Sequence, residues 1–484
     1  MIDGVDIDPG VGVTEAALVP ADDGTRDPHA TGVTGRIARG AAANIGGIGV
    51  TLVIQLVSVP VLLAAWGVPT YGEWLVLSAI PVYIALSDLS FSAVAGNSMV
   101  MLVAQGKRAD AATLGRRLSS IVSVTTGVVI AAAVGIALVF GGALGAGAAI
   151  PVAEAQVVLI ALFLQVAVVN QHGVLDAWYR AGGRYPLGST LRQFSRILEF
   201  GALVGSVLLG AGPGAAAMAF LGGSLVGFVA SAIVLRRAVP WSTLRPERPH
   251  LQTVRELLAP GVAFMAFPIG NALSLQGITI VIGLTLGATA VVVFSTTRTA
   301  TRVVLQAMGA LGNSVWPELT RSVGGGHLAE ARLILSRATR LSVGASFTLV
   351  LILAVAGPAV ISWWTRGAVS PPSGLLYVLL LVVVCNTFWY TRFMVLLATN
   401  QHAQVAVFYL LGTATALMAA VPLTAAFGLI GAAISLLAID IVMAGVVLPR
   451  SMRIVGDTPG AFLHVLVDAP VAVRRALAHG RSAT

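Results

Sequence analysis

The feature that most constrains this chain is a series of long apolar segments joined by short connections. About twelve segments can cross a bilayer as helices, since one crossing needs about 20 mostly apolar residues. They are 42–66, 72–96, 118–141, 154–178, 190–211, 214–235, 258–284, 288–316, 340–364, 375–398, 402–426 and 429–449. Only 10% of the residues are charged, against about 25% in a typical soluble domain. The sequence therefore predicts an all-α polytopic membrane protein.

Basic residues gather in the tails and connections that lie on one side of the membrane. They are Arg36 and Arg39, then Lys107, Arg108, Arg116 and Arg117, then Arg180 and Arg184, then Arg236, Arg237, Arg245 and Arg248, then Arg321, Arg332 and Arg337, and finally Arg450 and Arg453. The opposite connections contain almost none, Arg366 being the exception. The positive-inside rule then places both termini in the cytoplasm. These loops explain the net charge of +9, which does not indicate a nucleic-acid partner.

The order of the segments predicts the domain organisation. Residues 1–35 are rich in aspartate and small residues, a composition typical of a disordered cytoplasmic tail. We expect six-helix bundles over 36–237 and 258–450, joined by a cytoplasmic linker over 238–257. The last segment, 451–484, is mildly amphipathic and basic, and either lies on the anionic inner leaflet or is a solvated tail.

Short sequence matches indicate that the two bundles are repeats. Gly-Asn-Ser occurs at 96–98 and at 312–314, and Arg-Leu-Ser occurs at 117–119 and at 340–342. Asn170 likewise matches Asn386. The offsets of about 216 to 223 residues predict two pseudo-symmetric halves in the same orientation, with a central cleft between them.

The eighth apolar segment carries two arginines near its middle. Arg298 and Arg302 are four residues apart and share one helix face, which continues through Thr299 and Gln306. Each arginine costs about 2.5–3.5 kcal/mol at a helix centre. One interpretation is that the pair only holds the bundle together through acids or carbonyls. The other, which we favour, is that the stripe faces a water-filled interior and binds an anion.

Further polar residues in the spans are candidate site residues. Arg392, with Asn386 and aromatic neighbours, is a second substrate contact or an arginine that snorkels to the cytoplasmic edge. Asp88 and Asp440 either couple transport to an ion or neutralise an interior arginine. A third group forms either a cytoplasmic mouth for an anionic headgroup or interfacial salt bridges; it consists of Arg180, Arg192 and Arg196.

Several motifs along the chain resemble one family. They are YGEWL (71–75), LSDLSF (86–91), GN (96–97), TR (297–298), WPE (316–318) and ATN (398–400). Their order resembles the bacterial Wzx-type polysaccharide flippases, in the polysaccharide branch of the multidrug/oligosaccharidyl-lipid/polysaccharide exporter superfamily. Ser90 is a departure, since the family usually has glycine there.

This resemblance implies the exporter-superfamily, or MATE-like, fold and a transport function in the bacterial cytoplasmic membrane. The expected substrate is an undecaprenyl-pyrophosphate-linked oligosaccharide, moved from the inner to the outer leaflet by alternating access for assembly of a surface polysaccharide. Membrane lipids and a polysaccharide polymerase machinery are the expected partners.

Two other functions are alternatives to the flippase. An ion-coupled exporter of organic cations would need an acidic or aromatic cleft, so two central arginines count against it. A membrane glycosyltransferase or polymerase would need a large outward loop or a catalytic acidic motif. The sequence has no phosphate-binding loop and one cysteine, Cys385, so we expect no enzyme activity, no cofactor and no metal site.

Overall fold

The computed structural model describes residues 28–88, 91–144, 149–243, 251–399 and 401–458, together with 245, 247 and 460. The secondary structure within these ranges is helical throughout. Its elements are α1 (Pro28–Ala85), η1 (Leu86–Asp88), α2 (Phe91–Ala104), α3 (Arg108–Leu144), α4 (Val152–Ala181), α5 (Tyr185–Leu208), α6 (Pro213–Ala238), α7 (Leu251–Ala272), η2 (Leu273–Gly277), α8 (Ile278–Leu286), α9 (Ala288–Gly324), α10 (Leu328–Trp364), α11 (Ser373–Ala398) and α12 (His402–Val455). Residues 1–27 of the expected acidic tail lie outside the described residues, as does most of the C-terminal tail.

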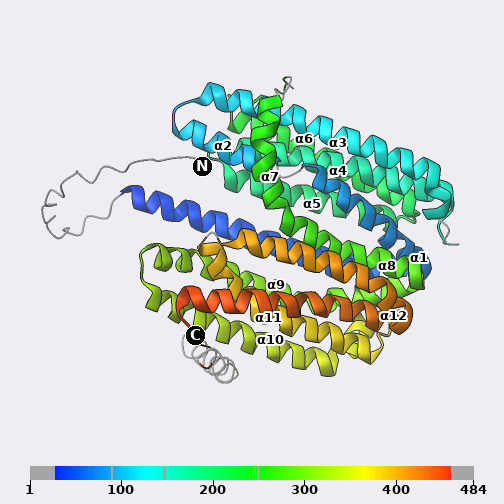
Figure 1. Cartoon of the computed structure of the whole chain (residues 1–484). Helices are drawn as coiled ribbons and strands as arrows, with labels where there is room; N and C mark the ends of the chain where they lie inside the picture. Colours follow the sequence, from blue (N-terminus) through cyan, green and yellow to red (C-terminus); the bar gives the residue numbers. More distant parts are fainter. Residues whose placement is uncertain are drawn as a thin grey trace, which may run out of the picture.

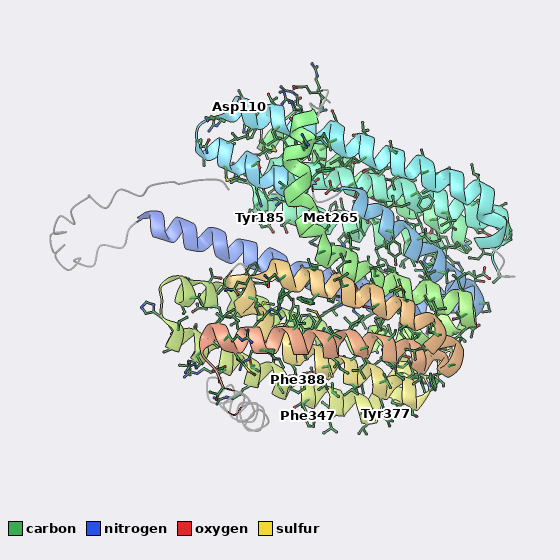
Figure 2. The ribbon with its side chains drawn as sticks, viewed as in Figure 1. Asp110, Tyr185, Met265, Phe347, Tyr377 and Phe388 are labelled. Atoms are coloured by element: carbon green, nitrogen blue, oxygen red, sulfur yellow. The ribbon has the colours of Figure 1, made fainter. Side chains whose placement is uncertain are left out.

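These helices make the predicted crossings. Eight of the described helices are long and apolar enough to span a membrane, and two of them, α1 and α12, are each bent into two crossings at a glycine, Gly67 and Gly428. Helices α5 and α9, with 24 and 37 residues, add the two crossings whose sequences are most polar. Phe347 and Tyr377 are about half exposed on the outer surface, as expected for side chains that face lipid (Figure 2).

The two halves repeat each other in backbone detail. Gly67 and Gly287 both adopt positive φ, with φ/ψ of 74°/173° and 85°/174°, and they are 220 residues apart. Gly106 and Gly326 have the same offset and φ values of 81° and 76°. The α2–α3 and α9–α10 turns also share their backbone hydrogen bonds, since Gly106 N–H donates to the Val103 carbonyl and Gly326 N–H to the Val323 carbonyl, both at 3.0–3.1 Å. The predicted pseudo-symmetric pair of six-helix bundles is confirmed.

The halves pack together at one end of the molecule and separate toward the other. Figure 1 shows the two groups of helices meeting near the labels α1 and α8, and diverging toward the end where α1 begins and α12 ends. At the packed end, a Cβ on Gly72 of the first half would lie 2.2 Å from the carbonyl oxygen of Ala288 in the second. The Trp364 indole N–H also donates to the Leu56 carbonyl there, at 2.8 Å. We call this the closed end, and the opposite end, which carries the arginine-rich turns, the basic end.

Candidate functional site

A cavity of about 850 Å³ lies between the two halves. The first half supplies part of α1 and α5, and the second half supplies most of the wall through α7, η2, α9, α11 and α12. Small-molecule sites usually enclose about 300–1,000 Å³, so this cavity has room for a polar headgroup with one or two rings.

Six of the residues that the sequence pointed to line this cavity. They are Arg196, Arg298, Arg302, Gln306, Asn386 and Asp440. The others, Thr299, Arg392, Asp88, Arg180 and Arg192, are not part of its lining. The Thr299 hydroxyl instead donates to the Ser295 carbonyl of its own helix, at 2.7 Å.

Arg298 is held beside a break in the neighbouring crossing. Its guanidinium donates to the Leu275 carbonyl at 2.9 Å and to the Thr279 hydroxyl at 3.1 Å, and it stacks over the Phe294 ring at 5.3 Å. Leu275 lies in η2, a π-helical turn. Such turns misalign backbone carbonyls and are frequent at functional sites. The π turn therefore gives this partly buried arginine a neutral acceptor and leaves its positive charge uncompensated.

Arg302 and Gln306 continue the same face of α9 toward the basic end. Arg302 Nε and Gln306 Oε1 are buried and have no hydrogen-bond partner among the described residues. Gln306 Nε2 donates across to Gln55 Oε1 of α1 at 2.9 Å. Arg298 and Arg302 form no ion pair with any described acid. Two cations on one cavity wall therefore keep their capacity to bind an anion.

Another part of the cavity wall, formed by α7, α11 and α12, is aromatic and carries one carboxylate. Asp440 of α12 accepts hydrogen bonds from Asn386 Nδ2 and from the Trp389 indole N–H, both at 2.8 Å. Phe267 of α7 and Tyr409 of α12 lie close to Trp389 and Phe393 of α11 and line the same wall. The sequence reasoning missed Phe267 and Tyr409, because single aromatics in apolar spans are indistinguishable from core or lipid-facing residues.

Arg392 lies at the basic end, away from the cavity. Its side chain is fully buried and donates to Asp457 Oδ2 at 2.6 Å, just after α12 ends. Arg332 of α10 contacts the same carboxylate at 3.4 Å and donates to the carbonyls of Val455 and Gly456. We call Arg332, Arg392 and Asp457 the α12 clasp. It fastens the end of α12 to α10 and α11.

The polar residues of the first half are mostly paired with one another. Arg192 of α5 forms an ion pair with Asp176 of α4, and Asp88 accepts a hydrogen bond from the Ser92 hydroxyl at 2.9 Å. Glu199 is buried and accepts hydrogen bonds from Ser224 and Gln165. Arg196 is the first-half cation that reaches the cavity, where it donates to the Thr51 hydroxyl at 3.1 Å.

Outside the spans, the linker between the halves is fastened to α3. Glu247 pairs with Arg116 at 2.7 Å and with Arg117 at 3.4 Å, and the hydrogen bond from Arg116 lowers the pKa of the Glu247 carboxyl. Among the described residues, no cluster of three or more His, Cys, Asp or Glu side chains has the arrangement of a metal site.

Comparison with known proteins identifies the fold. No family profile matches the chain, and no curated protein matches it in sequence. A multidrug resistance MATE family transporter of the MOP superfamily, in an inward-facing conformation, matches 84% of this chain and 98% of its own, with a TM-score of 0.66 and 15% identity. An outward-facing MATE structure matches 87% and 96%, with a TM-score of 0.59 and 16% identity. The lipid II flippase MurJ, in an inward closed conformation, matches 89% and 90%, with a TM-score of 0.62 and 14% identity.

This multi-pass membrane protein therefore has the fold of the MOP superfamily transporters. The predicted fold class is confirmed. At this level of identity, the substrate has to be argued from the cavity of this chain.

Proposed function

We propose that this protein is a flippase that moves undecaprenyl-pyrophosphate-linked oligosaccharides from the inner to the outer leaflet of a bacterial cytoplasmic membrane. The observation that carries the proposal is the cavity wall formed by Arg298 and Arg302, which no described acid neutralises. A pyrophosphate is the part of such a lipid that cannot cross hydrocarbon unaided. Paired guanidinium groups suit its oxygens because each can donate two parallel hydrogen bonds.

Alternating access is the proposed mechanism. The halves are packed at the closed end and enclose the cavity nearer the basic end, and solved structures with this fold include inward-facing and outward-facing forms. Arg196 lines the cavity from the first half, while Arg298 and Arg302 line it from the second. A headgroup held between them would be carried across as one half rocks against the other. The product would enter assembly of a surface polysaccharide, with a polymerase machinery as partner.

The other predicted roles fit this proposal in different ways. Arg192 and Arg180 are proposed to belong to a cytoplasmic mouth that attracts the anionic headgroup, and Asp88 remains the candidate for ion coupling in the first half. Arg392 is engaged by Asp457, so we place it in the supporting framework and not in the headgroup site. MurJ, one of the solved structures with this fold, is a lipid II flippase, and a lipid-linked pyrophosphate is the substrate class that we extend to this chain.

Binding and transport by arginine variants test the proposal. In reconstituted membranes, the Arg298→Ala/Arg302→Ala double variant should bind undecaprenyl pyrophosphate at least about 100-fold more weakly, since each charged hydrogen bond contributes about 1.5–3 kcal/mol. It should also lose flipping of the lipid-linked sugar. Arg321→Ala is the matched control, because Arg321 lies on the same helix with its side chain 76% exposed. Undiminished binding and flipping by the double variant would remove the proposed site.

An ion-coupled exporter of organic cations is the second candidate, favoured by the aromatic wall around Asp440 and by the MATE neighbours. The ligand that the protein binds distinguishes the two functions. An exporter of cations would bind tetraphenylphosphonium in competition with protons or sodium, and its affinity would rise when Arg302 is replaced by alanine. The flippase proposal predicts that the protein binds the anionic lipid in preference to tetraphenylphosphonium.

A further inference from the structure

The cavity contains two chemically different walls that are not paired with each other. Arg298 and Arg302 of α9 form the cationic wall, and Asp440 lies on the other wall with its aromatic neighbours. Asp440 makes no ion pair with any described basic residue. Opposite charges attract strongly in a cavity of low polarity. The two walls therefore suit a ligand that has an anionic end for the arginines and a hydrogen-bond donor for Asp440.

The hydrogen bonds of Asp440 leave one of its oxygens available. The side chain is almost entirely buried, and Oδ1 receives both hydrogen bonds, from Asn386 and from Trp389. Oδ2 receives none from the described residues, and Asp440 belongs to the cavity lining. An ionised carboxylate can only accept hydrogen bonds. The atom it offers to the cavity therefore suits a hydroxyl, amide or ammonium donor and repels an anion.

The aromatic residues around Asp440 add a surface for a ring. All five aromatic residues line the cavity; Trp389 and Phe393 are buried, whereas Tyr390, Tyr409 and Phe267 are partly exposed. Tyr409 lines the same cavity as Arg302 and Asp440. The negative face of an aromatic ring attracts the polarised C–H groups of a pyranose, and the hydroxyls of that pyranose can reach a carboxylate.

We propose that Asp440, Tyr390 and Tyr409 form a sugar subsite, which binds the first sugar of the lipid-linked oligosaccharide while α9 binds the pyrophosphate. This proposal rests on the proposed function and adds a selectivity to it. The first sugar is neutral or carries an amino group, and it is not a uronic acid, because a second anion on this wall would face the Asp440 carboxylate.

Three defined lipids in nanodiscs test the subsite. The probes are undecaprenyl pyrophosphate alone, the same lipid carrying one N-acetylglucosamine, and the same lipid carrying one glucuronic acid. We expect the wild-type protein to bind the N-acetylglucosamine lipid about tenfold more tightly than the bare lipid, as one charge-assisted hydrogen bond predicts. The glucuronic acid lipid should show no such gain.

Variants of the wall residues test whether the sugar-dependent gain in affinity comes from this wall. Asp440→Asn and, independently, Tyr409→Ala should lose the sugar-dependent gain, measured for each variant as the ratio of its own affinities for the N-acetylglucosamine lipid and the bare lipid. Tyr377→Ala is the matched control, because Tyr377 points to the outer surface of the second half (Figure 2). The bare-lipid affinity also serves as the folding control, so a variant that fails to fold is recognised by its loss, and the other variant then decides.

The possible failures are distinguishable. Equal affinity of the wild type for the bare and N-acetylglucosamine lipids would overturn the sugar subsite and leave the headgroup site intact. A retained gain in Asp440→Asn, with loss of proton or sodium dependence, would assign Asp440 to ion coupling and overturn its role in the subsite. Absence of binding to the bare lipid would instead count against the proposed function itself.

Discussion

The two halves have the same backbone fold, but their charged side chains have different partners. In the first half, Arg192 is neutralised by Asp176, and Glu199 is surrounded by neutral donors. In the second half, Arg298 and Arg302 face the cavity with no acid beside them. The same fold therefore holds charges that are paired, such as Arg192, and cations on the cavity wall that remain available to a ligand, such as Arg298 and Arg302.

The offset between equivalent turns shows which residues of the two halves correspond. With the offset of 220 residues that relates Gly67 to Gly287, Arg298 corresponds to Ser78 and Arg302 to Val82. The π turn that accepts a hydrogen bond from Arg298 lies in the first crossing of the second half, whereas residues 53–57 of α1 are α-helical. The cationic wall is therefore specific to the second half and is not a product of the repeat.

The largest expected effect comes from forcing the halves apart at the closed end. Gly72→Val places a side chain against the backbone of Ala288, 2.2 Å from its carbonyl oxygen, where neither half can yield without separation. We expect loss of the conformation described here and loss of flipping, measured in proteoliposomes and by distances between spin labels on the two halves. Gly201→Ala is the control, since its added Cβ would meet open space. Normal flipping by Gly72→Val would show that the packed closed end is not required for the cycle.

The second-largest effect is expected at the α12 clasp of the second half. Asp457→Asn removes the carboxylate that faces Arg392, whose side chain is fully buried, and leaves that charge poorly compensated. Loss of one partner of a buried pair costs about 3–5 kcal/mol, so we expect a marked fall in the thermal midpoint. The Arg332→Ala variant should fall less, because the Arg332 side chain is 49% exposed. Equal midpoints for the wild type and Asp457→Asn would contradict the stabilising role of the α12 clasp.

The smallest effect compares one arginine from each half directly. Arg192→Ala should cost about 1 kcal/mol of stability, because the pair with Asp176 is partly exposed and solvent screens it. Arg302→Ala should leave the thermal midpoint unchanged or raise it, since a partly buried cation without an acid partner is removed, but should weaken binding of undecaprenyl pyrophosphate. Measuring both quantities on both variants tests the division of roles. A loss of stability in Arg302→Ala as large as that in Arg192→Ala would contradict it.

The sequence alone determined the class of fold. Bilayer thickness fixes the length of each apolar segment, and the arrangement of basic connections predicts an even number of crossings. The short matches between the halves gave offsets that bracket the 220 residues relating Gly106 to Gly326. The spacing of Arg298 and Arg302 placed both on one face of α9, because a helix repeats every 3.6 residues.

Only the tertiary structure decided which polar residues share a cavity. Arg392 and Asp440 both lie in apolar spans, yet the first is held by Asp457 beyond α12 and the second lies on the cavity wall. Phe267 and Tyr409 come from different helices, far apart in the chain, and meet there. Periodicity within one helix says which side chains share a face, whereas the packing of several helices decides what that face meets.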